Sequence, residues 1–288
     1  MSPGDSQTIT LPDGRQLGYA IYGSRHPRSA VFVAFHGTPG SCLDYRMLHE
    51  WALKNGVTLV CPERPGHGLS TIDKNYVVTK HAHDVQRLMD HVGYERYKVI
   101  GAVGGGPYAL AFTHICTKVQ VQGTLLIAPV APIDAPKTGL PVSGTGRPMN
   151  RYLWRLLTIF PFLMELRVSI VSRKFLKNLA ALNPPTEELR KTEQGRKIIE
   201  GYARHGTPAG YVHDYCASHR YWGFELRDTD ANRIVIFAGG MDVQNPPDGI
   251  RYMRDRQRNT ELFVHPHDNH MTLQRNQMRR ALQILRNM

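Results

Sequence analysis

Runs of apolar residues alternate with amphipathic stretches along most of this chain. Eight short segments rich in β-branched and aromatic residues predict strands, at residues 7–11, 16–22, 30–35, 58–61, 97–101, 124–128, 233–238 and 261–265. Helical periodicity marks five further segments, at residues 41–55, 79–92, 107–117, 247–258 and 271–288. Several strand segments are continuously apolar, as strands buried on both faces are. Strands separated by helices predict an α/β protein with a mostly parallel, eight-stranded sheet.

This alternation stops between residues 130 and 229. The segment opens with a stretch rich in proline and glycine, "APVAPIDAPKTGLPVSGTGRP", and continues with helical patterns but without a strand. The pattern therefore predicts two units. Residues 1–129 and 230–288 form the α/β core domain, and residues 130–229 form a helical cap inserted after the sixth strand.

The segment "VIGAVGGGPYALAF", residues 99–112, has the form of a strand, a tight glycine turn and a helix. The sequence motif of such a turn with a catalytic serine is G-x-S-x-G. Residues 101–105 of this chain match it except that Val103 stands at the nucleophile position. A covalent acyl intermediate needs an oxygen or sulfur atom at that point. An isopropyl group has neither, so the serine route is closed at this position.

Four more motifs each follow a predicted strand: "FHGTPGS", "PERPGHGLS", "GGMDVQNPP" and "HPHDNHMTL". With the strand, turn and helix around Val103, they resemble the α/β-hydrolase fold superfamily, and most closely its cap-bearing branch with HG-x-PG and RPG-x-G-x-S signatures. The resemblance covers about residues 11–285. It implies an α/β-hydrolase sheet with helices on both faces and the inserted cap.

The resemblance also implies roles for particular residues. Asp242 takes the place of the catalytic acid and His270 that of the catalytic histidine, in the family's chain order. The backbone N–H groups of Thr38 and Gly104 would form an oxyanion hole, which needs no side chain at position 103. The nucleophile alone is not carried over, because it is replaced by Val103.

A substrate pocket is expected around these positions. His36 and Gly37 open the oxyanion loop, Cys42 follows it, and Trp154 and Tyr211 lie in the aromatic-bearing cap. An apolar floor at position 103 suits a hydrophobic small molecule. The thiol of Cys42 is a conceivable substitute nucleophile, although a side chain at the start of a helix more often packs inward.

Several other polar residues have plainer interpretations. His265 and His267 compete with His270 for the role of base, but positions i and i+2 near a strand end point to opposite faces, so no metal site is expected. His81 and His83 are interpreted as surface residues at the start of a helix, and Asp134 as a loop residue.

The charge, the cysteines and the apolar content of the chain indicate which classes of partner and which compartment to expect. The net charge is +12, but lysine and arginine are scattered without a recognition motif, so no nucleic-acid partner is expected. Four irregularly spaced cysteines and the lack of a leader pattern or an apolar span long enough for a membrane predict a cytoplasmic protein. No cofactor is indicated, and no pattern distinguishes a monomer from a homodimer.

Three functions remain open. The first is non-hydrolytic acid/base chemistry by the His270 and Asp242 dyad on a hydrophobic carbonyl compound, as in a lyase, isomerase, cyclase or carbon–carbon bond-forming or bond-breaking enzyme of secondary metabolism. The second is hydrolysis, by water that His270 activates directly or through Cys42. The third is ligand binding on a catalytically inactive scaffold.

Overall fold

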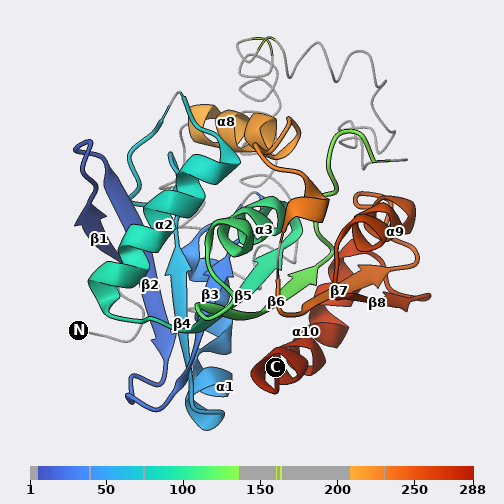
Figure 1. Ribbon diagram of the computed structural model, residues 1–288, viewed down its shortest axis with the longest axis horizontal. Helices are drawn as coiled ribbons and strands as arrows, with labels where there is room; N and C mark the ends of the chain where they lie inside the picture. The colour runs from blue at the N-terminus through green and yellow to red at the C-terminus, as the bar shows by residue number, and fades with distance from the viewer. Residues whose placement is uncertain are drawn as a thin grey trace, which may run out of the picture.

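The computed structural model describes residues 6–38, 40–73, 75–135, 160, 163, 208–229 and 231–288. Its centre is one eight-stranded sheet in the order β1-β2-β4-β3-β5-β6-β7-β8 (Figure 1). The strands are β1 Gln7–Thr10, β2 Gln16–Gly23, β3 Ala30–Phe35, β4 Val57–Pro62, β5 Tyr97–Ala102, β6 Val121–Ile127, β7 Ile234–Gly239 and β8 Thr260–His265. Strand β2 pairs antiparallel with both β1 and β4, and all other neighbours are parallel. The predicted fold class is confirmed.

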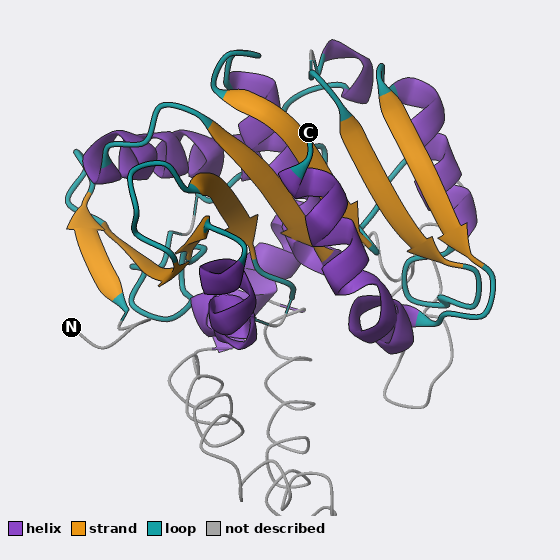
Figure 2. Ribbon diagram, turned by 90° about the horizontal axis from the view of Figure 1, so that it is seen from below, coloured by secondary structure: helices purple, strands orange, loops and turns teal. Residues whose placement is uncertain are grey.

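Helices cover both faces of the sheet, as Figure 2 shows. They are η1 Cys42–Leu48, α1 His49–Lys54, α2 Val78–Val92, η2 Val103–Gly105, α3 Gly106–Ile115, α8 Pro208–Ser218, η3 Leu226–Asp228, α9 Pro247–Arg256 and α10 His270–Arg286. Buried side chains of α2, α3 and α9 belong to one apolar cluster, and those of η1, α1 and α10 belong to a second. The central strands separate the two clusters, and every residue of β4, β5 and β7 is buried. Burial on both faces explains their continuous apolar sequences.

The register of the parallel strands gathers their carboxyl ends at one edge. Phe35, the last residue of β3, pairs with Gly101 on β5, and Ile127 on β6 pairs with both Ala102 and Phe237. The loops that carry the sequence motifs therefore leave the sheet from neighbouring points. Ligands of open α/β sheets bind at this edge.

One predicted helix differs in form. The segment 41–55 is a 3-10 helix, η1, followed by the short α1. Ser41 caps η1 in a reciprocal capping box with Asp44. The apolar pattern indicated a helix but did not distinguish the tighter turn from the α form.

The predicted cap lies largely outside the described residues. Within 130–229, the structure describes residues 130–135, 160, 163 and 208–229, which contain α8 and η3 and no strand. Helix α8 lies above α2 and α3 in the view of Figure 1. The division into core and cap stays a prediction.

The expected surface position of His81 is wrong, whereas that of His83 is right. His81 is fully buried on α2, and its ring lies edge-on to the rings of Phe35, Tyr76 and Tyr108. Neither ring nitrogen has a hydrogen-bond partner among the described residues. The helix is predicted correctly, but the expected exposure of His81 is wrong because its ring packs among aromatic rings of the interior.

Burial, and after it the positive charge of Arg64, lowers the pKa of His81 from 6.5 to about 3. The unfolded chain takes up this proton near pH 6.5 but the folded protein does not, so the free energy of unfolding decreases as the pH falls from about 6.5 toward 3. We expect His81→Phe to remove up to about 1.4 kcal/mol of this loss per pH unit. Urea unfolding at pH 7, 6 and 5 measures it. His83→Gln, on the exposed face of the same helix, is the control, and an equal acid sensitivity of His81→Phe and the native protein would contradict the assignment.

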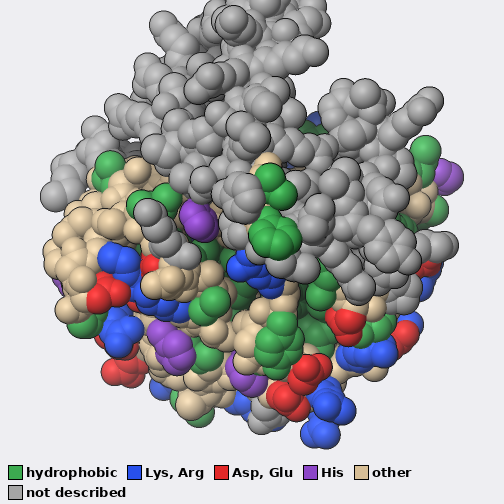
Figure 3. Space-filling model, turned by 90° about the horizontal axis from the view of Figure 1, so that it is seen from above, with side chains coloured by type: hydrophobic (Ala, Val, Ile, Leu, Met, Phe, Trp, Pro, Cys, Tyr) green, Lys and Arg blue, Asp and Glu red, His purple; other side chains and the backbone are tan. Residues whose placement is uncertain are grey.

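Charged side chains of both signs are interspersed on the face shown in Figure 3, in the part that is not grey. Exposed ion pairs elsewhere on the described surface join Arg233 to Glu261 and Arg251 to Asp248. Among the described residues, no helix has the length and apolarity to cross a bilayer.

Candidate active site

The turn after β5 keeps the shape of a nucleophile elbow without its nucleophile. Val103 has a φ of +52°, in the left-handed region that β-branched residues rarely adopt. Glycines on either side permit the close approach of strand and helix. A Cβ at Gly101 would lie 2.6 Å from Cβ of Ala109, and one at Gly105 would lie 2.2 Å from the carbonyl oxygen of Phe35. Strain of this kind costs about 1–3 kcal/mol, so the surrounding packing imposes the elbow on valine.

Asp242 and His270 are hydrogen-bonded to each other. Asp242 lies in the turn after β7, and His270 is the first residue of α10, after β8. Nδ1 of His270 lies 2.8 Å from Oδ2 of Asp242, and both residues are buried. The other carboxylate oxygen, Oδ1, accepts from the backbone N–H groups of Gln244 and Asn245 at 2.8 and 2.9 Å. A carboxylate only accepts, so Nδ1 carries the hydrogen and Nε2 is the nitrogen that can take a proton.

The two competing histidines lie differently. His265 stacks on Phe237 with ring centroids 5.4 Å apart, and burial lowers the pKa of His265. His267 is exposed. The described part of the chain contains no cluster of histidine, cysteine and acidic residues able to hold a metal ion. Within the described residues, His270 is the one of the three whose ring is hydrogen-bonded to a carboxylate, the arrangement of a catalytic base.

The loop after β3 packs against the elbow. A Cβ built on Gly104 would lie 3.3 Å from the backbone nitrogen of Thr38, and one on Gly37 would lie 3.7 Å from Cβ of Val103. The structure therefore brings together Thr38 and Gly104, the two residues whose N–H groups the family resemblance implies as oxyanion donors. Their service as donors is part of the proposal below.

The expected pocket residues are placed less uniformly. Gly37 is half-buried, and His36 is buried with its ring against that of His67, 5.3 Å between centroids. Trp154 lies outside the described residues. Tyr211 belongs to α8, but its side chain is also outside them.

Cys42 is fully buried instead of lining an open pocket. Its Sγ donates to Oε1 of Glu63 at 3.0 Å. Burial, together with the neighbouring Glu63 carboxylate, raises the pKa of this thiol well above its ordinary value. A thiol that stays protonated is a poor nucleophile. The thiol route to hydrolysis is therefore not supported, because the loop that follows the HG-x-PG motif turns this side chain into the second apolar cluster.

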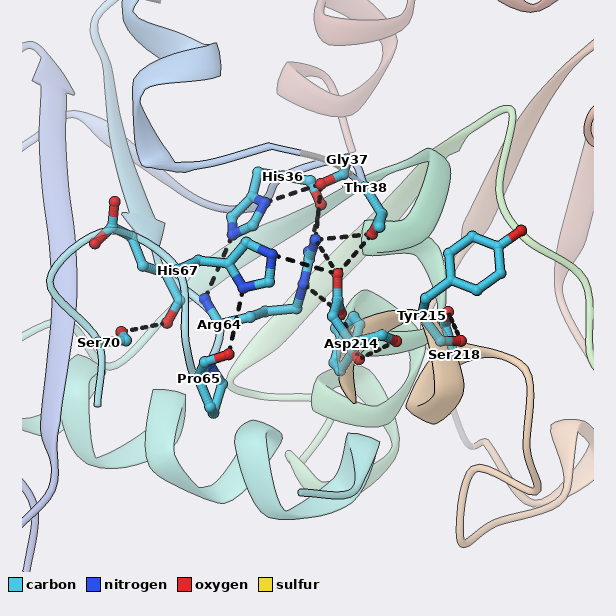
Figure 4. A network of polar contacts seen from close by, with 12 residues as sticks. His36, Gly37, Thr38, Arg64, Pro65, His67, Ser70, Asp214, Tyr215 and Ser218 are labelled. Carbon is cyan, nitrogen blue, oxygen red and sulfur yellow. Dashed lines mark hydrogen bonds and ion pairs between the residues drawn. The ribbon is translucent and has the colours of Figure 1, made fainter. Parts of the chain in front are cut away.

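Sequence reasoning missed a buried ion pair beside the oxyanion loop. Arg64, from the RPG motif after β4, pairs with Asp214 of α8, and both side chains are fully buried (Figure 4). Nε of Arg64 lies 2.8 Å from Oδ1 of Asp214. The arginine stands in a quoted motif, but nothing in the local pattern around Asp214 indicates a buried charge. Only the contact between distant segments identifies the pair.

Comparison with known proteins fits this architecture. Residues 30–280 match the alpha/beta hydrolase family, and the chain belongs to that family. The uncharacterized hydrolase YcgS of Bacillus subtilis is 26% identical over 166 residues, which are 55% of this chain and 56% of that protein. The bifunctional esterase/perhydrolase of Acinetobacter calcoaceticus is 28% identical over 127 residues, 43% of this chain and 45% of the relative. The matched region thus spans about half the length of these curated relatives.

The likeness of fold extends over the whole chain. An esterase from Exiguobacterium antarcticum superposes with a TM-score of 0.72 at 15% identity, with 98% of each chain covered. Members of the alpha/beta hydrolase family are enzymes. The two curated relatives and the Exiguobacterium protein are each named as a hydrolase or an esterase. At this level of identity the superposition establishes the fold alone.

Proposed function

We propose that this chain is a nucleophile-free enzyme of the alpha/beta hydrolase family, which uses His270 as a general base on a hydrophobic carbonyl compound. One observation carries the proposal: a complete hydrogen-bonded dyad is retained on a fold whose nucleophile position is Val103. The dyad holds the imidazole in the tautomer that accepts a proton at Nε2. Without serine, the proton must come from the substrate or from water.

The favoured source is a C–H group next to the substrate carbonyl. Nε2 of His270 takes that proton, and the C–H electron pair forms an enolate whose charge moves to the carbonyl oxygen. The N–H groups of Thr38 and Gly104 stabilise this oxygen, and Asp242 stabilises the imidazolium. Return of the proton to another carbon gives isomerisation, and loss of a leaving group gives elimination. The enolate carbon can also attack a carbonyl, which forms a bond or a ring.

Hydrolysis is the second candidate, because hydrolases are what the relatives' names describe. In that reaction Nε2 takes a proton from water, which attacks the carbonyl directly. The isopropyl group of Val103 disfavours this route, because it places an apolar surface where a serine hydroxyl or an ordered water would stand.

We therefore expect a panel of ketones, β-dicarbonyl compounds and esters to separate the two routes in deuterated water. Deuterium incorporation next to a carbonyl that depends on the enzyme, and is unchanged by prior treatment with a fluorophosphonate, supports the base mechanism. Oxygen from ¹⁸O-labelled water in a carboxylic acid product, without such exchange, supports the hydrolytic candidate. Loss of activity with a phosphonylated serine contradicts both. Saturable binding of panel members without conversion of any would favour the binding-protein alternative.

A further inference from the structure

The buried guanidinium of Arg64 binds the carbonyl side of the peptide group between Gly37 and Thr38. Nη2 of Arg64 donates to the carbonyl oxygen of Gly37 at 2.7 Å and to Oγ1 of Thr38 at 3.0 Å, and Nη1 donates to the carbonyl of His36. That carbonyl of Gly37 and the N–H of Thr38 belong to one planar trans peptide group. The two bonds point in opposite directions, so a fixed carbonyl also fixes the direction of the N–H.

The same contact strengthens the donor. A hydrogen bond from a charged group polarises the peptide it touches, and bonds in a chain reinforce one another in a low-dielectric interior. The guanidinium is charged here. Burial alone would lower the pKa of Arg64, but the carboxylate of Asp214 raises it above its ordinary value.

Asp214 fixes this arrangement from α8. Its Oδ2 accepts from Thr38 Oγ1 at 2.8 Å and from Arg64 Nη2 at 3.0 Å, and its Oδ1 accepts from the hydroxyl of Tyr108 at 2.8 Å. Burial by itself raises the pKa of Asp214, but Arg64 beside it holds that pKa below the ordinary value. The side chains converge between the oxyanion loop, the RPG loop and α8 in Figure 4.

The backbone brings α8 close enough for this contact. A Cβ at Gly210 would lie 2.2 Å from the carbonyl oxygen of Gly66, and one at Gly66 would lie 2.6 Å from Cα of Gly210. Two glycines are thus required where α8 touches the RPG loop. Because Asp214 belongs to α8, the contact that places α8 against the RPG loop also fixes the position of Asp214.

We propose that Asp214 and Arg64 form a positioning pair, through which the seating of α8 sets the direction and donor strength of the Thr38 N–H in the oxyanion hole. This inference rests on the proposed function for the use of that N–H, but the geometry it describes can be tested apart from any reaction.

The first test is spectroscopic and uses the full chain labelled with ¹⁵N in threonine only. Loss of a signal in Thr38→Val identifies the Thr38 amide. We expect Asp214→Asn to move this amide proton upfield and to speed its exchange with solvent, because the guanidinium loses its charged anchor. Asp84→Asn is the matched control, since Asp84 is a buried partner of Arg15 with bonds of 2.7 and 3.1 Å and none of the contacts described here joins it to the oxyanion loop.

A Thr38 signal in folded Asp214→Asn that is unchanged, or that moves downfield, overturns the inference. Circular dichroism establishes folding. If Asp214→Asn does not fold, Tyr108→Phe keeps both charges and removes the hydroxyl that donates to Oδ1 of Asp214 at 2.8 Å and to its backbone carbonyl at 3.5 Å, and we expect a smaller upfield shift from it. No shift in Tyr108→Phe then counts against the inference.

The second test measures catalysis in the Val103→Ser background, with p-nitrophenyl esters as the probe. Removal of an oxyanion donor costs about 10²–10³ in kcat, and we expect a misdirected donor to cost about tenfold or more in kcat with a much smaller change in KM. If Thr38 responds in the spectrum but the serine variant hydrolyses no ester, the positioning stands and the proposed use of the oxyanion hole fails. If ester hydrolysis appears and Asp214→Asn leaves its kcat unchanged, the positioning role fails and the oxyanion hole stands.

Discussion

Replacement of His270 by alanine is expected to lower turnover of the panel's best substrate by at least about 10²-fold, which is the usual contribution of a general base. Nε2 is the acceptor of the proton in both candidate reactions, so its loss removes the chemical step. KM should change little, because the proposed role of Nε2 is to take the proton in the chemical step and not to hold the substrate. Exchange or product formation in deuterated water is the measurement.

Two further variants make this result specific. Asp242→Asn should lower kcat as well, because an amide at this position can donate to Nδ1 and so place the hydrogen on Nε2. His267→Ala is the control, since this exposed histidine lies near the same loop. Turnover that survives in His270→Ala would falsify the assignment of the base.

Val103→Ser is expected to add ester hydrolysis through a serine nucleophile, a route that valine at this position closes. A serine here would complete a triad with His270 and Asp242, whose hydrogen bond of 2.8 Å is already formed. The residue's φ of +52° suits serine better than a β-branched side chain. We expect covalent labelling by a fluorophosphonate and hydrolysis of p-nitrophenyl esters about 10²-fold or more above background.

Val103→Ala is the matched control, because it also removes the isopropyl group but adds no hydroxyl. The double variant with His270→Ala should lose both the labelling and the hydrolysis. The native reaction should weaken or persist in Val103→Ser, since its base is untouched. Equal rates for the serine and alanine variants would show that the oxyanion hole is not competent, which would favour a binding protein.

Most of the fold could be predicted from local patterns. The apolar runs that became β4, β5 and β7 are buried on both faces, and such burial leaves a continuous signature in the sequence. The turns that carry Val103, Asp242 and His270 follow strands whose ends the same patterns located. The parallel register then brings these turns to one edge of the sheet, and the pair formed by Asp242 and His270 follows from it.

Side-chain environments away from the motifs could not be predicted in this way. His81 lies at the start of α2, where a polar residue suggests a solvated face, but aromatic rings from three other segments enclose it. Cys42 stands next to a functional loop, yet its thiol is bound to Glu63 in the interior. In both cases the side chain's environment depends on residues from other elements: Phe35 and Tyr108 for His81, and Glu63 for Cys42.

Local sequence patterns are enough to predict the class of fold, the order of the motifs and the valine at the nucleophile position, because each depends on residues close together along the chain. The contact of Asp214 with Arg64 and Thr38, in contrast, arises from tertiary packing. These residues are far apart in sequence, and no local pattern indicates that Asp214 is buried. The buried carboxylate is stabilised by the ion pair with Arg64 and the hydrogen bond from Thr38. The position of such charges depends on which elements pack against each other in the folded protein, and local sequence does not encode that packing.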